Sequence, residues 1–148
     1  MSDPYQRALR WLAQRERSRW DIRQRLADIP AEECEALLDR LEREGYLSDR
    51  RVAESLQRRA ARGHGVQRLR HDLRQHGIDA ELARPVLEEA LRHELEVARR
   101  VRDRRFPQWP ITAEERLRQI RYLGNRGFGA ETIRQVLMVP PSFESEAG

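Results

Sequence analysis

Apolar residues recur along this chain at helical spacing, and one arrangement of them occurs three times. An apolar residue, a turn or capping residue and then Ala-Glu are found at 29–32, 78–81 and 128–131. A pair of apolar residues lies six and seven positions beyond each alanine, and a leucine ends an earlier helical stretch before each copy. Apolar positions with this period form one face of a helix. The pattern therefore predicts an all-α chain of tandem repeats.

Each repeat also has an earlier helical stretch, with apolar residues at the spacing i, i+1, i+4. In the first repeat these are Ala8, Leu9 and Leu12. Capping signals agree with helix starts, because Ser18 and Thr112 are each followed three residues later by an acid. Each unit is therefore predicted to consist of three short helices.

The repeats divide the chain into three predicted units, 5–47, 48–95 and 96–138. A three-helix unit of this size buries little apolar surface, so each unit should pack against its neighbours. We expect an elongated, curved array without a deep catalytic cleft. Residues 139–148 contain two prolines, small residues and acids, and are expected to form a flexible tail.

The composition of the 148 residues excludes several classes of protein. No run approaches the roughly 20 apolar residues of a membrane-spanning helix, and no secretory signal is visible at the N-terminus. The single cysteine, Cys34, can form neither an internal disulfide nor a zinc site made of cysteines, and we expect it to be a small core residue. These features favour a cytoplasmic protein with no membrane partner.

The charges alternate in sign along the repeats. All 29 positively charged residues are arginines, against 25 acids. Residues 7–25, 48–77 and 97–126 carry net charges of +5, +5 and +6, whereas 26–47 and 78–96 carry −5 and −4. The first two helices of each unit are thus basic. If the units stack regularly, these helices could form an arginine stripe.

Arginine binds phosphates and carboxylates through a planar fork of five donors, so a basic stripe suits either nucleic acid or an acidic protein surface. Six arginines between positions 58 and 74 meet a single acid, Asp72. The simpler interpretation of any one of them is a solvated or locally paired side chain. The candidate residues for binding a partner or DNA are Arg19, Arg23, Arg51, Arg58, Arg59, Arg62, Arg68, Arg70, Arg74, Arg121 and Arg126.

Other chemistry is sparse. The four histidines do not have the spacing of metal ligands, and a lysine-dependent phosphate loop is excluded because the chain has no lysine. The three tryptophans are expected in the core or between units. The sequence therefore predicts no catalytic residue, no metal and no cofactor, and hence a protein that is not an enzyme.

Several stretches resemble the RecX family, bacterial regulators of the RecA recombinase. Residues 45–54, Gly-Tyr-Leu-Ser-Asp-Arg-Arg-Val-Ala-Glu, and the Arg-Gly-His-Gly at 62–65 are similar to the central signature of that family. Residues 18–26 and 122–134 are similar to its early and C-terminal elements. The resemblance covers about residues 5–138. Val52, where the family often has phenylalanine, is a departure that suggests altered packing.

The resemblance implies tandem three-helix repeats and a regulator that binds within the helical groove of the RecA nucleoprotein filament. Such a protein limits filament growth and suppresses strand exchange, ATP hydrolysis and co-protease activity, in DNA recombination, DNA repair and the SOS response. The implied partners are the RecA filament and single- or double-stranded DNA within it. A monomer is the simplest interpretation.

Two alternatives stay open from the residues themselves. Two helices joined by a short turn at Gly77 also suit a helix-turn-helix protein that binds DNA without RecA. The acidic third helix of the first two units argues against sequence-specific readout, because it would repel phosphates. A purely structural interaction module is the other alternative, and it predicts no sensitivity to reversal of the arginine charges.

Overall fold

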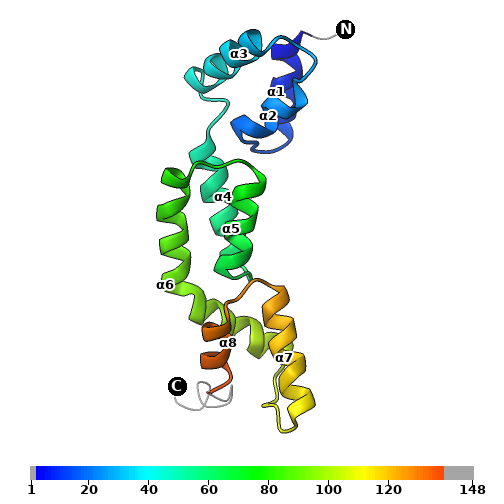
Figure 1. The fold of residues 1–148 in the computed structure, drawn as a ribbon, viewed down its shortest axis with the longest axis vertical. Helices are drawn as coiled ribbons and strands as arrows, with labels where there is room; N and C mark the ends of the chain where they lie inside the picture. Colours follow the sequence, from blue (N-terminus) through cyan, green and yellow to red (C-terminus); the bar gives the residue numbers. More distant parts are fainter. Residues whose placement is uncertain (1–2, 139–148) are drawn as a thin grey trace.

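The computed structural model describes residues 3–138, which form an elongated array of helices (Figure 1). Those residues include no β-strand, so the predicted all-α class is confirmed. The predicted flexible tail, 139–148, lies outside the described residues. The helices are α1 (Pro4–Gln14), α2 (Arg19–Arg25), α3 (Ala31–Arg43), α4 (Asp49–Ala61), α5 (Val66–Gln75), α6 (Ala80–Arg105), α7 (Ala113–Asn125) and α8 (Ala130–Val136).

Two helices begin with the reciprocal cap that the sequence predicted. At α2, the Ser18 hydroxyl accepts a hydrogen bond from the Asp21 backbone N–H at 3.0 Å, and the Asp21 carboxylate accepts one from the Ser18 N–H at 3.0 Å. Thr112 and Glu115 make the same pair of bonds at the start of α7. Each cap satisfies backbone donors that the helix leaves unpaired, and is typically worth about 1 kcal/mol.

Three separate hydrophobic cores lie along the array. The first is enclosed by α1, α2 and α3, the second by α4, α5 and the first half of α6, and the third by the second half of α6 with α7 and α8. Each unit thus has a small core of its own. Fully buried members are Ile22, Leu38 and Leu41 in the first core, Leu69 and Leu73 in the second, and Leu123 and Phe128 in the third.

The third helix of the second unit and the first helix of the third unit are one continuous helix, the 26-residue α6. No glycine or proline interrupts the chain between Pro85 and Pro107, and strong helix formers fill this stretch. Val86 belongs to the second core and Val97 to the third, and α6 changes direction between the two cores (Figure 1). The expected break between two helices near residue 95 is therefore absent, and the units share a helix.

The second helices of the three units, α2, α5 and α7, follow one another along one side of the array (Figure 1). Ser18, the N-cap of α2, donates its hydroxyl to the carbonyl of His76, the C-cap of α5, at 2.6 Å. Gly65, the N-cap of α5, donates its N–H to the carbonyl of Arg126, the C-cap of α7, at 2.9 Å. The same joint between units is therefore used twice.

Glycine makes both joints possible because the chains approach too closely for a side chain. A Cβ on Gly77, whose φ is +64°, would lie 2.6 Å from the Cβ of Trp20. A Cβ on Gly65 would lie 2.2 Å from the carbonyl oxygen of Gly127. Only a residue without a Cβ allows such contacts. The turns at Gly65 and Gly77 are thus the sites where neighbouring units contact each other.

Candidate binding surface

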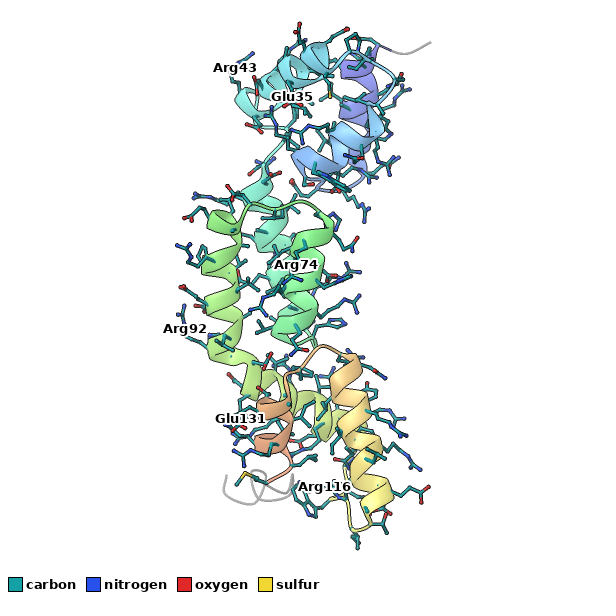
Figure 2. The ribbon with its side chains drawn as sticks, viewed as in Figure 1. Glu35, Arg43, Arg74, Arg92, Arg116 and Glu131 are labelled. Atoms are coloured by element: carbon teal, nitrogen blue, oxygen red, sulfur yellow. The ribbon has the colours of Figure 1, made fainter. Side chains whose placement is uncertain are left out.

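Arg19 and Arg23 of α2, both predicted to bind a partner, are engaged by acids of α3. The Arg19 guanidinium donates to Asp39 at 2.9 Å and to Glu42 at 2.7 Å. Both arginines also donate to Glu35, Arg19 at 3.0 Å and Arg23 at 2.8 Å, and Figure 2 shows Glu35 on the side of α3 that faces α2. The positive charge of α2 is therefore largely neutralised within the first unit.

The two arginines change the acidity of Glu35. Hydrogen bonds from Arg23 and then from Arg19 lower the pKa of Glu35 from 4.5 to about 2. A carboxyl group whose pKa is lower in the folded than in the unfolded chain stabilises the fold above the unfolded pKa, and this contribution is lost as the pH falls. The first unit is thus stabilised by a network that acid removes.

We expect the variant Glu35→Gln to lose less stability in acid than the wild type. The free energy of unfolding of the wild type should fall as the pH drops from 4.5 to about 2, because Glu35 takes up its proton in that range. Urea denaturation followed by circular dichroism at neutral pH and at about pH 3 measures the difference. Glu33→Gln, on the same helix but outside the network, should follow the wild type. Equal pH dependence for all three proteins would contradict the assignment.

Arg51 and Arg68 are also paired within the chain. Arg51 lies 3.1 Å from the Glu16 carboxylate and donates to the Gly45 carbonyl at 2.8 Å, so it ties the start of α4 to the first unit. Arg68 pairs with Asp72 one turn further along α5 at 3.2 Å. Both side chains remain exposed, so these pairs leave guanidinium donors facing solvent.

Arg126 lies at the junction of the second and third units. Its guanidinium donates to the Gly63 carbonyl at 3.0 Å and to the Tyr122 hydroxyl at 3.1 Å. Burial, together with the nearby charge of Arg126, lowers the pKa of His64 in the same turn. Arg126 therefore fastens the two units together.

The remaining predicted contact residues have no carboxylate within ion-pair distance in the part of the chain that the structure describes. All of them are exposed, and they lie on or directly after α4, α5 and α7. The basic surface open to a partner is thus on the second and third units. These residues are Arg58, Arg59, Arg62, Arg70, Arg74 and Arg121.

A surface groove of about 630 Å³ lies between α5 and the first half of α6. Arg70 and Arg74 of α5 and Arg84 of α6 line it, and Figure 2 shows Arg74 on α5. Leu91, with 63% of its surface exposed, is part of the same lining. The groove therefore combines apolar side chains with three guanidinium groups and with the carboxylates of Glu88 and Glu94. Its other apolar residues are Val66, Leu73, Ile78, Ala83 and Leu87.

Sequence reasoning missed three arginines near the end of α6. Arg100, Arg104 and Arg105 line a second hollow, of about 190 Å³, together with Arg62 and Arg126. The sequence does show a local excess of positive charge here, since the stretch 99–105 contains five arginines. Their grouping depends on α6 continuing through this stretch, which brings residues four apart onto one face.

Cysteine and tryptophan lie where the sequence placed them. Cys34 is buried in the first core, and burial raises the pKa of its thiol. Trp11 packs against the first core and Trp109 against the third, whereas Trp20 packs between units against Gly77. In residues 3–138, no three His, Cys, Asp or Glu side chains are grouped so that they could hold a metal ion. No helix in the same range is long and apolar enough to cross a membrane.

The two helices that flank Gly77, α5 and α6, have the order of a helix-turn-helix. The start of α6 would be the reading helix, and there the exposed side chains include Glu81 and Glu88. Arg84, between them, pairs with Glu81 at 3.0 Å. Carboxylates at this position oppose the approach of DNA phosphates. The local geometry therefore disfavours sequence readout by α6.

Comparisons with known proteins match the same three units. Models of the first, second and third three-helix domains of RecX match residues 5–41, 48–87 and 93–137. The chain is 41% identical over 133 residues to the regulatory protein RecX of Leptothrix cholodnii, covering 88% of this chain and 85% of the relative. It is 39% identical over 131 residues to the regulatory protein RecX of Herbaspirillum seropedicae, covering 87% and 85%.

Two solved structures show the same fold. The crystal structure of RecX from Lactobacillus salivarius superposes with a TM-score of 0.75 at 20% identity, covering 91% of this chain and 92% of that chain. A second crystal structure of a regulatory protein RecX superposes with a TM-score of 0.74 at 23% identity, covering 90% of this chain and 70% of that chain. The three domain models match in order, and relatives at about 40% identity span most of both chains. This chain therefore belongs to the RecX family of regulatory proteins.

Proposed function

We propose that this protein regulates the RecA recombinase by binding within the helical groove of the RecA nucleoprotein filament. There it limits filament growth and suppresses strand exchange, ATP hydrolysis and co-protease activity. It acts by binding and catalyses no reaction, as a cytoplasmic monomer in DNA recombination, DNA repair and the SOS response. Membership of the RecX family supports this proposal.

The observation that carries the proposal is the groove between α5 and α6. Apolar side chains along it offer surface that a protein partner can bury, and Arg70 and Arg74, which have no ion-pair partner among the described residues, favour a partner that also presents acids. Arginine is also one of the residues that most often supply binding energy at protein interfaces. The groove therefore suits a protein surface better than it suits nucleic acid alone.

The length of the array supports a partner that is itself a polymer. We place the three modules at 5–47, 48–95 and 96–138. We assign the main contacts to the last two, because they hold the six predicted contact arginines that have no carboxylate partner among the described residues. A second module binds at a high effective concentration once the first has bound, so an extended array can bridge neighbouring subunits of a filament. In this arrangement Arg19 and Arg23 support the first module instead of contacting the partner.

The wild-type protein should lower ATP turnover by RecA on single-stranded DNA and should sediment with the filament. The double variant Arg70→Glu/Arg74→Glu should need at least about tenfold more protein for half-inhibition, which is about 1.4 kcal/mol of lost binding. The measurement is a coupled ATPase titration together with filament co-sedimentation.

Arg10→Glu/Arg43→Glu is the matched control, because both residues are exposed arginines of the first unit and the charge change is the same. It should inhibit like the wild type. Unchanged ATP turnover and no sedimentation of the wild type would contradict regulation of RecA. If both double variants lost inhibition to the same extent, the groove would not be the surface that contacts RecA.

A further inference from the structure

The 190 Å³ hollow at the junction of the second and third units has a wall of one charge. Arg62 after α4, Arg100, Arg104 and Arg105 of α6, and Arg126 after α7 all line it. The lining contains no carboxylate among residues 3–138, and its other members are Val101 and Tyr122. Five guanidinium groups around one small space repel one another unless an anion lies among them.

Three of the five arginines are positioned by contacts within the chain. Arg100 donates to the Ala61 carbonyl and Arg126 to the Gly63 carbonyl. The guanidinium groups of Arg105 and Arg126 lie 5.4 and 5.3 Å from the centre of the Tyr122 ring. A guanidinium has five N–H donors, so these contacts leave donors available while restricting the side chains. The site is therefore organised before any ligand arrives.

The chemistry of the wall selects among anions. Its charged side chains are all donors, and the Ala61 and Gly63 carbonyls beside it already accept bonds from Arg100 and Arg126. A phosphodiester backbone presents acceptors only and so matches a wall of donors. An acidic peptide also brings backbone N–H groups, for which the guanidinium groups of the wall offer no acceptor. A volume of 190 Å³ is also below the roughly 300–1,000 Å³ of small-molecule pockets, which favours one group of a polymer.

We propose that this hollow binds a phosphate of a nucleic-acid strand and holds that strand across the junction of the second and third units. The inference deepens the proposed function by naming one nucleic-acid contact. It needs neither RecA nor a reading helix in the major groove, because guanidinium groups bind the backbone without regard to sequence.

The test uses the full chain alone with a fluorescently labelled single-stranded oligodeoxythymidylate, followed by fluorescence anisotropy over a range of salt concentrations. The wild type should bind, and more weakly as salt rises. Arg104→Gln/Arg105→Gln should bind at least about fivefold more weakly. Its plot of log K against log salt should be shallower by about 0.7, because the variant loses one phosphate contact and each such contact on a single strand contributes about 0.7.

Arg10→Gln/Arg43→Gln, with the same change in net charge, should bind like the wild type, and circular dichroism should show all three proteins folded. Absence of oligonucleotide binding by the wild type, or equal weakening by both variants, would overturn the proposal. Polyglutamate should displace the labelled oligonucleotide less well than unlabelled oligonucleotide of equal charge does. Equal competition by the two would also overturn the proposal and would indicate an acidic polypeptide as the ligand. The RecA ATPase titration is independent of these measurements, so regulation of RecA can stand if this site fails.

Discussion

The variant Gly65→Ala is expected to lower the free energy of unfolding by about 3 kcal/mol, the upper part of the range for overpacking a close contact. The added methyl group would lie 2.2 Å from the carbonyl oxygen of Gly127 and 2.4 Å from its carbonyl carbon. Both are backbone atoms, so no side-chain rotation relieves the clash. Moving the chains apart would also break the bonds from the Gly65 N–H to Arg126 and from the Gln67 N–H to Gly127.

Gly124→Ala is the matched control for this prediction. Gly124 lies within α7, and a Cβ there would meet nothing within 4 Å. Alanine favours a helix over glycine by about 1 kcal/mol, so this variant should be slightly more stable than the wild type. Urea denaturation followed by circular dichroism measures both. If Gly65→Ala were as stable as the wild type, the close contact between units would not exist in solution.

The variant Glu94→Ala is expected to lower the free energy of unfolding by about 3 kcal/mol, because two hydrogen bonds to a buried carboxylate are lost together. Glu94 is 6% exposed and belongs to the shared helix α6. One carboxylate oxygen accepts a bond from the Val66 N–H at the start of α5, at 2.6 Å. The other accepts a bond from the Thr132 hydroxyl on α8, at 2.5 Å. Alanine leaves both donors without this partner.

Two variants of α6 complete the test of Glu94. Glu96→Ala removes an exposed carboxylate two residues further along and should change the free energy of unfolding by less than about 0.5 kcal/mol. Glu94→Gln keeps one carbonyl oxygen and should fall between the wild type and Glu94→Ala. Equal unfolding free energies for Glu94→Ala and Glu96→Ala, from the same urea titrations, would show that the carboxylate does not join the units.

The local parts of this fold were predictable because short-range rules govern them. The capping pairs at Ser18 and Thr112 depend on residues three positions apart, and both form as predicted. The cores follow from helical spacing, so Leu38 and Leu73 are buried where the repeat placed them. The family resemblance likewise depended on linear motifs, such as the segment 45–54.

The pairing and grouping of the arginines were not predictable, because they depend on contacts between helices that are far apart in the sequence. Arg19 reaches Glu42, which is 23 positions away, so its neutralisation could not be inferred from the charge of its own helix. The grouping of Arg62, Arg104 and Arg126 requires the bend and length of α6. Charge blocks counted along the chain show where cations are abundant, but they do not show which of them already have partners.

The shared helix also determines how the molecule responds to force and to partial unfolding. One helix, α6, crosses from the second core into the third. The first core is linked to the second through the short segment between α3 and α4, the contacts of α2 and the bonds of Arg51 to Glu16 and Gly45. Because this one helix, α6, forms part of both the second and the third core, we expect the second and third modules to unfold as one cooperative block. The first module is the separable one. We expect the molecule to separate into these two blocks at the segment between α3 and α4.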